Sequence, residues 1–333
     1  MIIVLDEAYR DEADKRFAGH ELRYFPPTYA DRGKFSEMLA DAHVLGMRRV
    51  LPFPIDRRVV GGAAALQFIH KSGSGADHFD TDLLSELGIL LGLNTGFNAV
   101  TVAEHTVSMI LILLRRITDF AAIIDSGRWA LSLPGDEPLM LSGKTIGLVG
   151  IGAIGARVAR AMIAMDAKVI AYHPDPKKPL PEGVEWVDLD TLVAASDVVS
   201  LHTPLTPATT RLIGARQIGL MKPTAILVNT ARGGVVDEPA LIAALQEGRI
   251  RAAGLDVFEE EPLPPNHPLR SLPNVFATPH IAGVAKEVTS RQIEGTLDNI
   301  AIFVSGACPE RLVNPVILKD GRARARHLIR AFA

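Results

Sequence analysis

Short apolar runs, separated by polar or helix-forming segments, recur along the whole chain. In the first part of the chain they predict strands at Ile2–Asp6, Val44–Met47, Leu66–His70 and Ile89–Leu93. In the later part they predict six strands, at Ile146–Val149, Val169–Tyr172, Val198–Leu201, Ala225–Asn229, Ala252–Leu255 and Val275–Ala277. Continuous apolar runs of this length are typical of parallel strands that helices cover on both faces. The pattern therefore predicts an α/β fold with two Rossmann-like, doubly wound parallel sheets.

Helix signals lie between and after these runs. The pair Asp80–Thr81 can cap a helix that ends at Gly88, where a left-handed C-cap belongs. A long helix begins at Ala99, and its apolar residues are spread too densely to leave it solvated on all sides. Another helix is expected over residues 286 to 305. If the two α/β units exchange their terminal helices, the chain crosses between them near Ala99 and Gly283, so the fold is discontinuous in sequence.

Composition and charge exclude several classes of protein. The 333 residues exceed the usual size of one hydrophobic core and suggest two domains. The formal net charge of −3 gives no overall attraction to nucleic acid or to an anionic membrane, so we expect neither as a partner. The single cysteine, Cys308, can form neither an internal disulfide nor a sulfur-based metal site. The apolar run Met109–Leu114 is too short to span a bilayer, and the chain starts with a strand pattern rather than a signal peptide. We therefore expect a cytoplasmic protein that needs no metal.

One strand runs directly into a glycine-rich turn and a helix, as Gly150-x-Gly152-x-x-Gly155. Gly150 permits a tight turn, Gly152 lets the backbone approach phosphate groups, and Gly155 lets the helix pack on the strand. The helix N-terminus offers free N–H groups and a partial positive charge to an anion. Such turns also serve plain packing, but this one predicts a dinucleotide site.

Three polar residues follow the ends of three later strands: Arg232, Glu261 and His280. In an open α/β sheet ligands bind beyond the carboxyl ends of the strands, so all three are expected at one crevice. Taken singly, His280 could be a structural histidine, Arg232 a surface ion pair, and Glu261 part of a solvated run of three glutamates. Their common placement after a dinucleotide turn favours a catalytic site.

The motif blocks resemble those of the D-isomer-specific 2-hydroxyacid dehydrogenases. The resemblance rests on the glycine turn, Asn229–Gly234, Gly254–Glu259 and Pro279–Ile281, in this order and spacing. It extends over nearly the whole chain, including Gly73–Asp77 and Val102–Thr106. It implies an NAD(P)-dependent oxidoreductase that interconverts a D-2-hydroxy acid and its 2-oxo acid, and it implies a homodimer.

The resemblance also implies how the domains divide the work. Residues 1–98 together with 284–333 are expected to form a flavodoxin-like substrate-binding domain, and residues 99–283 a dinucleotide-binding Rossmann domain. An interdomain cleft between them would hold the substrate, a small 2-oxo or 2-hydroxy acid.

In the family the matching arginine, glutamate and histidine form the catalytic set, which here implies Arg232, Glu261 and His280. Reduction of a 2-oxo acid delivers hydride to C2 and a proton to the ketone oxygen, and histidine suits that proton transfer. Glu261 would bind the second ring nitrogen of His280 and favour the imidazolium. Arg232 would hold the substrate carboxylate with a planar, charged fork.

Further contacts carry over by motif. The implied cofactor-binding residues are Gly150, Gly152, Ala153, Ile154, Gly155, His173, Asp175, Thr106, Thr203, Pro204, Thr230, Ala231 and Asp256. The implied substrate-binding residues are Ser72, Gly73, Ser74, Gly75, Arg232 and His280. Asp256 is expected to bind the nicotinamide carboxamide, although an aspartate at a strand end can also cap a turn.

Two features leave alternatives open. Asp175 could bind the ribose hydroxyls of NAD and repel a 2′-phosphate, whereas His173 with Lys177 or Lys178 could accept that phosphate. The absence of an arginine beside the ribose favours NAD, and NADP stays open. Arg48 and Arg49 could hold a distal anionic group of the substrate or pair with Asp56 on the surface.

Two other functions compete with this interpretation. Some relatives keep the catalytic set but act as dinucleotide-sensing transcriptional corepressors, and others oxidise formate or phosphite with a similar fold. The sequence does not name the acid, because lactate-like, glyoxylate-like and 3-phosphoglycerate-like substrates present the same carboxylate and carbonyl.

Overall fold

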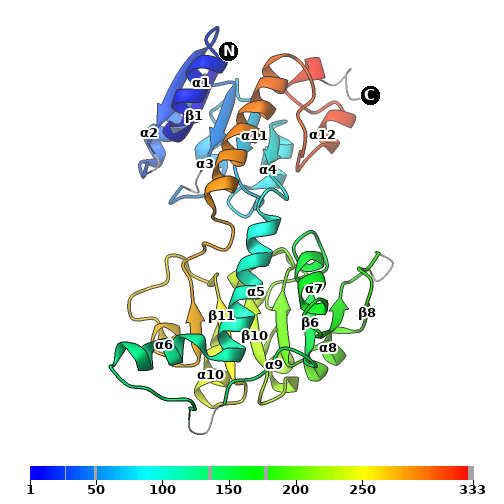
Figure 1. Ribbon diagram of the computed structural model, residues 1–333. Helices are drawn as coiled ribbons and strands as arrows, with labels where there is room; N and C mark the ends of the chain where they lie inside the picture. The colour runs from blue at the N-terminus through cyan, green and yellow to red at the C-terminus, as the bar shows by residue number, and fades with distance from the viewer. Residues whose placement is uncertain (27, 49–50, 134–136, 176–178, 329–333) are drawn as a thin grey trace. The chain divides into compact units, whose positions relative to one another are not determined.

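The computed structural model describes residues 1–26, 28–48, 51–133, 137–175 and 179–328 (Figure 1). The chain divides into two compact units. Unit 1 comprises Met1–Asn98 and Ala285–Ala333, and unit 2 comprises Ala99–Val284. Each unit is an α/β layer structure around one parallel sheet.

Unit 1 contains a five-stranded parallel sheet in the order β2-β1-β3-β4-β5. Its strands are β1 (Ile2–Asp6), β2 (Glu21–Phe25), β3 (Val44–Met47), β4 (Phe68–Lys71) and β5 (Leu90–Leu93). Its helices are η1 (Glu7–Tyr9), α1 (Arg10–Arg16), α2 (Arg32–Leu39), α3 (Arg57–Val60), α4 (Thr81–Glu86), α11 (Lys286–Val304) and α12 (Val316–Lys319).

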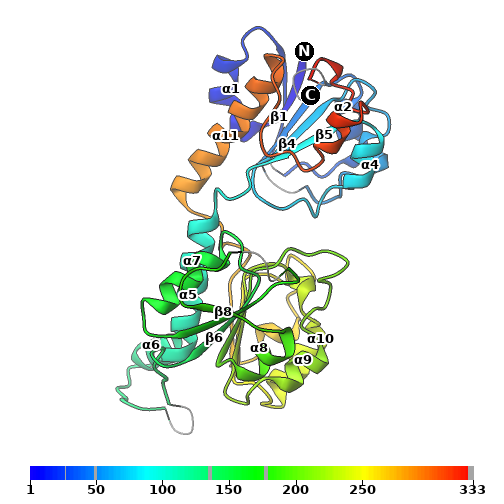
Figure 2. The same cartoon turned by 90° about the vertical axis from the view of Figure 1, so that its right-hand side faces the viewer.

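Both faces of this sheet are covered, as Figure 2 shows. Successive strand residues point to opposite faces. Val4 therefore enters the core that includes Phe35 and Leu39 of α2, whereas Leu5 enters the core that includes Ile300 and Phe303 of α11. Burial on both sides explains why β3 and β5 are apolar throughout, whereas β4 ends in the buried polar residues His70 and Lys71.

Unit 2 contains a seven-stranded parallel sheet in the order β12-β11-β10-β9-β6-β7-β8. Its strands are β6 (Thr145–Val149), β7 (Lys168–Tyr172), β8 (Val184–Trp186), β9 (Val198–Leu201), β10 (Ile226–Asn229), β11 (Ala252–Leu255) and β12 (Val275–Ala277). Its helices are α5 (Ala99–Arg115), α6 (Ile117–Asp125), α7 (Gly155–Ile163), α8 (Leu189–Ala195), α9 (Ala215–Leu220), η2 (Gly233–Val235), α10 (Glu238–Gln246) and η3 (Pro268–Arg270).

Helices α5 and α7 lie on one face of the unit 2 sheet, and α8, α9 and α10 lie on the other (Figure 2). The strand order continues in opposite directions on the two sides of β6, through β9 on one side and β7 on the other. This reversal is the point where doubly wound sheets bind their ligands.

The predicted fold class is confirmed, but each sheet has one more strand than the apolar runs indicated. Strand β2 lies at the edge of its sheet and has one exposed, three partly buried and one buried residue, and Glu21–Phe25 contains no continuous apolar run. Strand β8 has three residues and is also an edge strand. An edge strand has a neighbouring strand on one side only and is less completely covered by helices. Its sequence therefore shows a weaker hydrophobic pattern than that of a central strand.

His70, in the middle of the unit 1 sheet, is an unusual buried polar residue. Its side chain has no exposed surface, and neither ring nitrogen has a hydrogen-bond partner among the described residues. The ring packs edge-on against Phe68 at 5.9 Å, and a Cβ at Gly92 would lie 2.7 Å from its Cδ2. Burial, assisted by the positive charge of Arg311, lowers the pKa of His70 from 6.5 to about 3.

We expect His70 to make the protein less stable in acid. Between pH 6.5 and pH 3 the unfolded chain binds a proton at this histidine that the folded chain does not, so stability rises with pH over this window. Between pH 5 and pH 8 this difference in proton binding changes the free energy of unfolding by about 2 kcal/mol. His70→Leu should remove that part of the pH dependence in denaturant titrations at the two pH values, whereas His20→Leu at the surface should not. An unchanged difference in His70→Leu would contradict this account.

Candidate active site

The glycine-rich turn joins β6 to α7 at the carboxyl end of the unit 2 sheet. Gly150 has φ +99°, and a Cβ there would lie 2.7 Å from the carbonyl oxygen of His202, which follows β9. A Cβ at Gly155 would lie 2.4 Å from the carbonyl oxygen of Gly150. These two glycines are required by packing. Gly152 differs, because among the described residues no atom beyond Gly152 and its two chain neighbours lies within 4 Å of its Cβ position. Its missing side chain leaves space for a ligand rather than for the protein.

Arg232 lies in the loop after β10, and two neighbours fix that loop. The Asn229 side chain donates to the carbonyl of Arg232 at 2.9 Å and accepts from the N–H of Ala231 at 3.0 Å. A Cβ at Gly233 would lie 1.9 Å from backbone atoms of Phe258. Only glycine allows this approach, so the loop after β10 lies directly against the segment that leads to Glu261.

Glu261 connects that segment to His280. One carboxylate oxygen accepts the backbone N–H of Phe258 at 3.0 Å, and the other lies 2.6 Å from Nδ1 of His280. Partial burial raises the pKa of Glu261, but the hydrogen bonds from His280 and Phe258 and the charges of His280 and Arg232 outweigh it. The pKa of Glu261 is therefore below its usual value, and the carboxylate is ionised at neutral pH.

His280 has a left-handed backbone, with φ +54°, in the loop after β12. The buried carboxylate of Asp256 fixes this loop by accepting from Thr278 Oγ1 at 2.6 Å, Ile281 N at 2.9 Å and Ala282 N at 2.9 Å. The N–H of His280 also donates to the carbonyl of Asp256 at 2.8 Å. The hydrogen bonds of the Asp256 carboxylate thus serve to position His280. Binding of the nicotinamide carboxamide by Asp256 stays a prediction.

Helix α5 adds contacts that the sequence patterns indicated only in part. Nε2 of His105, which the patterns did not single out, lies 3.0 Å from Oγ1 of Thr278. Thr106 and Thr230, both predicted to contact the cofactor, join their hydroxyls at 2.8 Å. In the sequence, the signal that could have identified His105 was a histidine within a mostly apolar helix.

The other predicted cofactor residues also follow strand ends. Thr203 and Pro204 come directly after β9, and the N–H of Asp175 donates to Nδ1 of His173 at 2.9 Å after β7. Lys177 and Lys178 lie outside the described residues, as does Arg49. Asp56, a possible partner of Arg48 and Arg49, caps α3 through Arg58 N and lies 3.8 Å from Arg32.

The predicted substrate loop, Ser72–Gly75, follows β4 in unit 1. Ser72 is buried, and its hydroxyl contacts Tyr9 and Thr296 rather than solvent. Gly73 has φ +100°, and the exposed Ser74 donates to Oδ1 of Asn98 at 3.1 Å. The four residues thus differ in role, since Ser72 faces inward and Ser74 outward.

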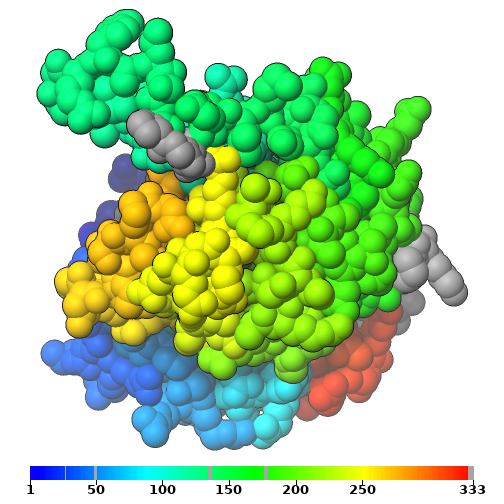
Figure 3. Space-filling model, turned by 90° about the horizontal axis from the view of Figure 1, so that it is seen from below, coloured from blue at the N-terminus to red at the C-terminus, as the bar shows by residue number. Residues whose placement is uncertain are grey.

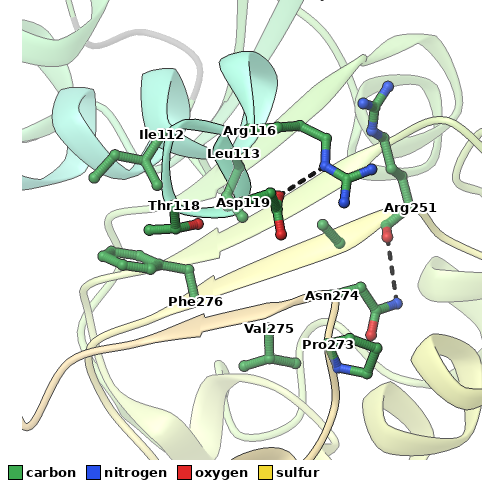
Figure 4. Close-up of a pocket in the computed structure, with 11 residues that line it drawn as sticks. Ile112, Leu113, Arg116, Thr118, Asp119, Arg251, Pro273, Asn274, Val275 and Phe276 are labelled. Atoms are coloured by element: carbon green, nitrogen blue, oxygen red, sulfur yellow. Dashed lines mark hydrogen bonds and ion pairs between the residues drawn. The ribbon is translucent and has the colours of Figure 1, made fainter. Parts of the chain in front are cut away.

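Unit 2 also contains a pocket of about 210 Å³ beside α5 and α6 (Figure 4). Arg116 pairs with Asp119 there, and Asn274 donates to the carbonyl of Arg251. Arg251 and Asn274 directly precede β11 and β12, so the pocket lies at the amino ends of the strands. That is the edge opposite to the catalytic candidates, and the pocket is not the site formed by them.

No described helix is long and apolar enough to cross a membrane. No described group of three or more histidine, cysteine, aspartate or glutamate residues is arranged to hold a metal ion.

The chain is similar to known proteins over most of its length. Residues 107–282 match the family described as "D-isomer specific 2-hydroxyacid dehydrogenase, NAD binding domain". A glyoxylate reductase of Thermofilum pendens is 40% identical over 308 residues, which cover 90% of this chain and 88% of that protein. The crystal structure of an NAD-dependent formate dehydrogenase from Staphylococcus aureus with NAD has a TM-score of 0.84 at 30% identity, covering 94% and 98%. A D-lactate dehydrogenase from Aquifex aeolicus with NAD and lactic acid has a TM-score of 0.83 at 29% identity, covering 91% and 96%. The chain therefore belongs to the D-isomer specific 2-hydroxyacid dehydrogenase family, as the motif blocks indicated, and is an oxidoreductase with an NAD-binding domain.

Proposed function

We propose that this protein interconverts a D-2-hydroxy acid and its 2-oxo acid, with His280 as the acid and base and NAD(H) as the preferred cofactor. The observation that carries the proposal is the 2.6 Å contact between His280 and an ionised Glu261, in the loops where β11 and β12 end. A proton donor held by a carboxylate at the ligand-binding edge of an NAD-binding sheet suits reduction of a ketone.

The nicotinamide, when bound, supplies hydride to C2 of the oxo acid, and the protein supplies the proton. Glu261 binds Nδ1 of His280, which leaves Nε2 to donate to the ketone oxygen as that oxygen gains negative charge. In the reverse direction Nε2 accepts the hydroxyl proton. Glu261 keeps its charge throughout and stabilises the imidazolium.

Arg232 is the proposed partner of the substrate carboxylate. Its guanidinium can offer two parallel N–H groups to a carboxylate, and its permanent charge also polarises the neighbouring ketone. The loop that carries it is fixed by Asn229 and Gly233, so the group is positioned before substrate binds. Gly73, Ser74 and Gly75 are the proposed contacts from unit 1.

We propose that the cofactor occupies the glycine turn, with Gly150, Gly152, Ala153, Ile154 and Gly155 around its pyrophosphate. Support comes from the empty Cβ position of Gly152 and from the N-terminus of α7. The exposed carboxylate of Asp175, at the end of β7, favours NAD over NADP because it would repel a 2′-phosphate.

The substrate class proposed is a small 2-oxo acid, for which the glyoxylate reductase relative makes glyoxylate the first choice to test. The formate dehydrogenase neighbour raises formate oxidation as an alternative. Oxidation of formate to carbon dioxide transfers a hydride but no hydroxyl proton, so this reaction would not use His280 and Glu261 as a proton-transfer pair.

A single cysteine, Cys308, suits a reducing compartment, and we propose a cytoplasmic location.

We further propose a homodimer formed through α6 and the segment after it. Large apolar side chains are exposed there, at Ile117 (51%), Ile124 (55%), Trp129 (82%), Leu131 (86%) and Met140 (68%). Figure 3 shows this blue-green segment standing out from the surface of unit 2. Several large exposed apolar side chains on one segment are typical of association surfaces, and a second copy of the chain is the proposed partner.

Turnover of 2-oxo acids tests the proposed reaction. NADH oxidation at 340 nm should be observed with glyoxylate, hydroxypyruvate or pyruvate, and more slowly with NADPH. His280→Asn should lower kcat by about 10²- to 10⁴-fold with NADH affinity unchanged, because the proton donor is lost while asparagine accepts the left-handed backbone. Tight NADH binding without turnover of any acid would instead indicate a sensing protein, and full activity of His280→Asn would refute the assignment.

Glu261→Gln should lower kcat/KM for the oxo acid by about tenfold, because a neutral amide stabilises the imidazolium proton donor less than a carboxylate does. The carboxylate, ionised because its pKa is lowered, favours the protonated ring, and a neutral amide does not. Glu260→Gln, one residue away and exposed, is the matched control. The measurement is kcat/KM for the oxo acid between pH 5 and pH 9, and superimposable profiles of Glu261→Gln and wild type would contradict the pairing.

The dimer proposal predicts that Trp129→Ser with Leu131→Ser yields a monomer in light scattering after gel filtration. Loss of two large apolar contacts removes much of the buried area that a stable interface requires. Met165→Ser, an exposed apolar residue beyond the end of α7, should leave the mass unchanged. A wild-type protein of monomer mass at micromolar concentration would rule the dimer out.

A further inference from the structure

The first residue of the predicted substrate loop is the centre of a buried hydroxyl network. Oγ of Ser72 lies 2.7 Å from the hydroxyl of Tyr9 and 2.9 Å from Oγ1 of Thr296, and it donates to the carbonyl of Gln292 at 3.3 Å. Tyr9, Ser72 and Thr296 are 1%, 4% and 0% exposed. The two hydroxyl pairs have the distances of normal O–H···O hydrogen bonds, and the contact with the Gln292 carbonyl is longer and weaker.

Asn94, directly after β5, extends the network, although its own side-chain oxygen is buried without a hydrogen-bond partner among the described residues. Its side-chain nitrogen donates to the carbonyl of Gln292 at 2.8 Å and to Oγ1 of Thr296 at 3.0 Å. The network therefore joins four segments that are distant in sequence: η1, the end of β4, the end of β5 and the middle of α11. Groups buried this deeply are costly to leave unpaired, so the contacts constrain all four segments together.

The Ser72 hydroxyl has three protein partners, which are the hydroxyls of Tyr9 and Thr296 and the carbonyl of Gln292. Ser72 can only donate to the carbonyl, whereas in each hydroxyl pair either oxygen can be the donor. Burial raises the pKa of Tyr9, so its hydroxyl stays protonated. A serine hydroxyl has one proton and two lone pairs, so these three partners match its full capacity.

This count changes the role expected for Ser72. A hydroxyl with both lone pairs and its proton engaged cannot also bind a substrate carboxylate. The residues that follow it are more exposed, and the other end of the loop is tied down separately, because Nζ of Lys71 donates to the carbonyl of Gly75 at 3.3 Å. The loop is thus fixed at its first and last residues, and Gly73 and Ser74 between them are more exposed.

We infer that Tyr9, Ser72 and Thr296 are positioning residues, which hold the backbone of Gly73–Gly75 in the conformation that receives the carboxylate of the 2-oxo acid. The inference rests on the proposed function for the identity of that ligand. None of the three residues touches the substrate. Their effect reaches the substrate only through the loop. They should therefore affect substrate affinity, but neither cofactor binding nor proton transfer at His280.

The chain offers matched substitutions for a test. Thr296→Val keeps the shape of the side chain and removes the hydroxyl, whereas Thr296→Ser keeps the hydroxyl. Tyr9→Phe removes one hydroxyl partner of Ser72, and Tyr24→Phe removes a tyrosine hydroxyl that binds Asp14 outside the network. Because Tyr9 and Thr296 both contact the Ser72 hydroxyl, their combined substitution should be non-additive.

Steady-state kinetics should show that Tyr9→Phe and Thr296→Val raise KM for the oxo acid by about threefold to tenfold, with KM for NADH unchanged. Thr296→Ser and Tyr24→Phe should behave as wild type. A purely structural role would lower the melting temperature and leave KM for the oxo acid unchanged at 25 °C, and that result would overturn the inference.

Hydrogen exchange of the peptide that contains Gly73–Gly75 separates this inference from the proposed function. Exchange in that peptide should be faster in Tyr9→Phe and Thr296→Val than in Thr296→Ser, whether or not the protein reduces any oxo acid. If wild type has no turnover but exchange responds as expected, the loop is positioned by the network and the proposed reaction is wrong. Equal exchange in all variants would refute the positioning role.

Discussion

The carboxylate of Asp256 is the interaction on which the geometry of the candidate active site depends. It is fully buried, and it accepts hydrogen bonds from three donors of the loop after β12. A buried carboxylate with this many donors resists both movement and loss of a partner, because any opening leaves a charge unpaired. His280 lies between those donors in a left-handed conformation that costs backbone energy, which the bonds to Asp256 offset. The ring is thereby directed to Glu261 before any ligand binds.

Parallel topology explains why the remaining groups converge. The strands β10, β11 and β12 are neighbours with their carboxyl ends at one edge, so Arg232, Glu261 and His280 follow strands that lie side by side. Topology sets only the approximate place, and local packing sets the distance. The loop of Arg232 lies against Phe258 because Gly233 lacks a Cβ, and that contact places the guanidinium where its charge lowers the pKa of Glu261.

The sequence predicted those parts of the fold and site that depend on local pattern. Buried central strands are continuous apolar runs, so they were found, whereas edge strands β2 and β8 were missed because half of their surface is uncovered. Glycine spacing identified the turn at Gly150, but it could not show that Gly152 alone faces open space. The bonds of Asp256 to residues more than twenty positions away depend on tertiary structure, and no local pattern contains them.

Ser72 is a second residue whose role the local sequence pattern could not reveal. Its place in a glycine-rich loop after a strand predicted a ligand contact, but the partners that occupy its hydroxyl come from Tyr9 and Thr296, which are 63 and 224 residues away. Asp256 and Ser72 therefore have a similar role, since each is a polar residue directly after a strand whose hydrogen bonds go to its own unit. Such residues support the neighbours that meet the ligand. A polar residue at a functional edge is best assigned a role after its hydrogen bonds are counted, because a group already bonded to the protein acts largely through the residues that it holds.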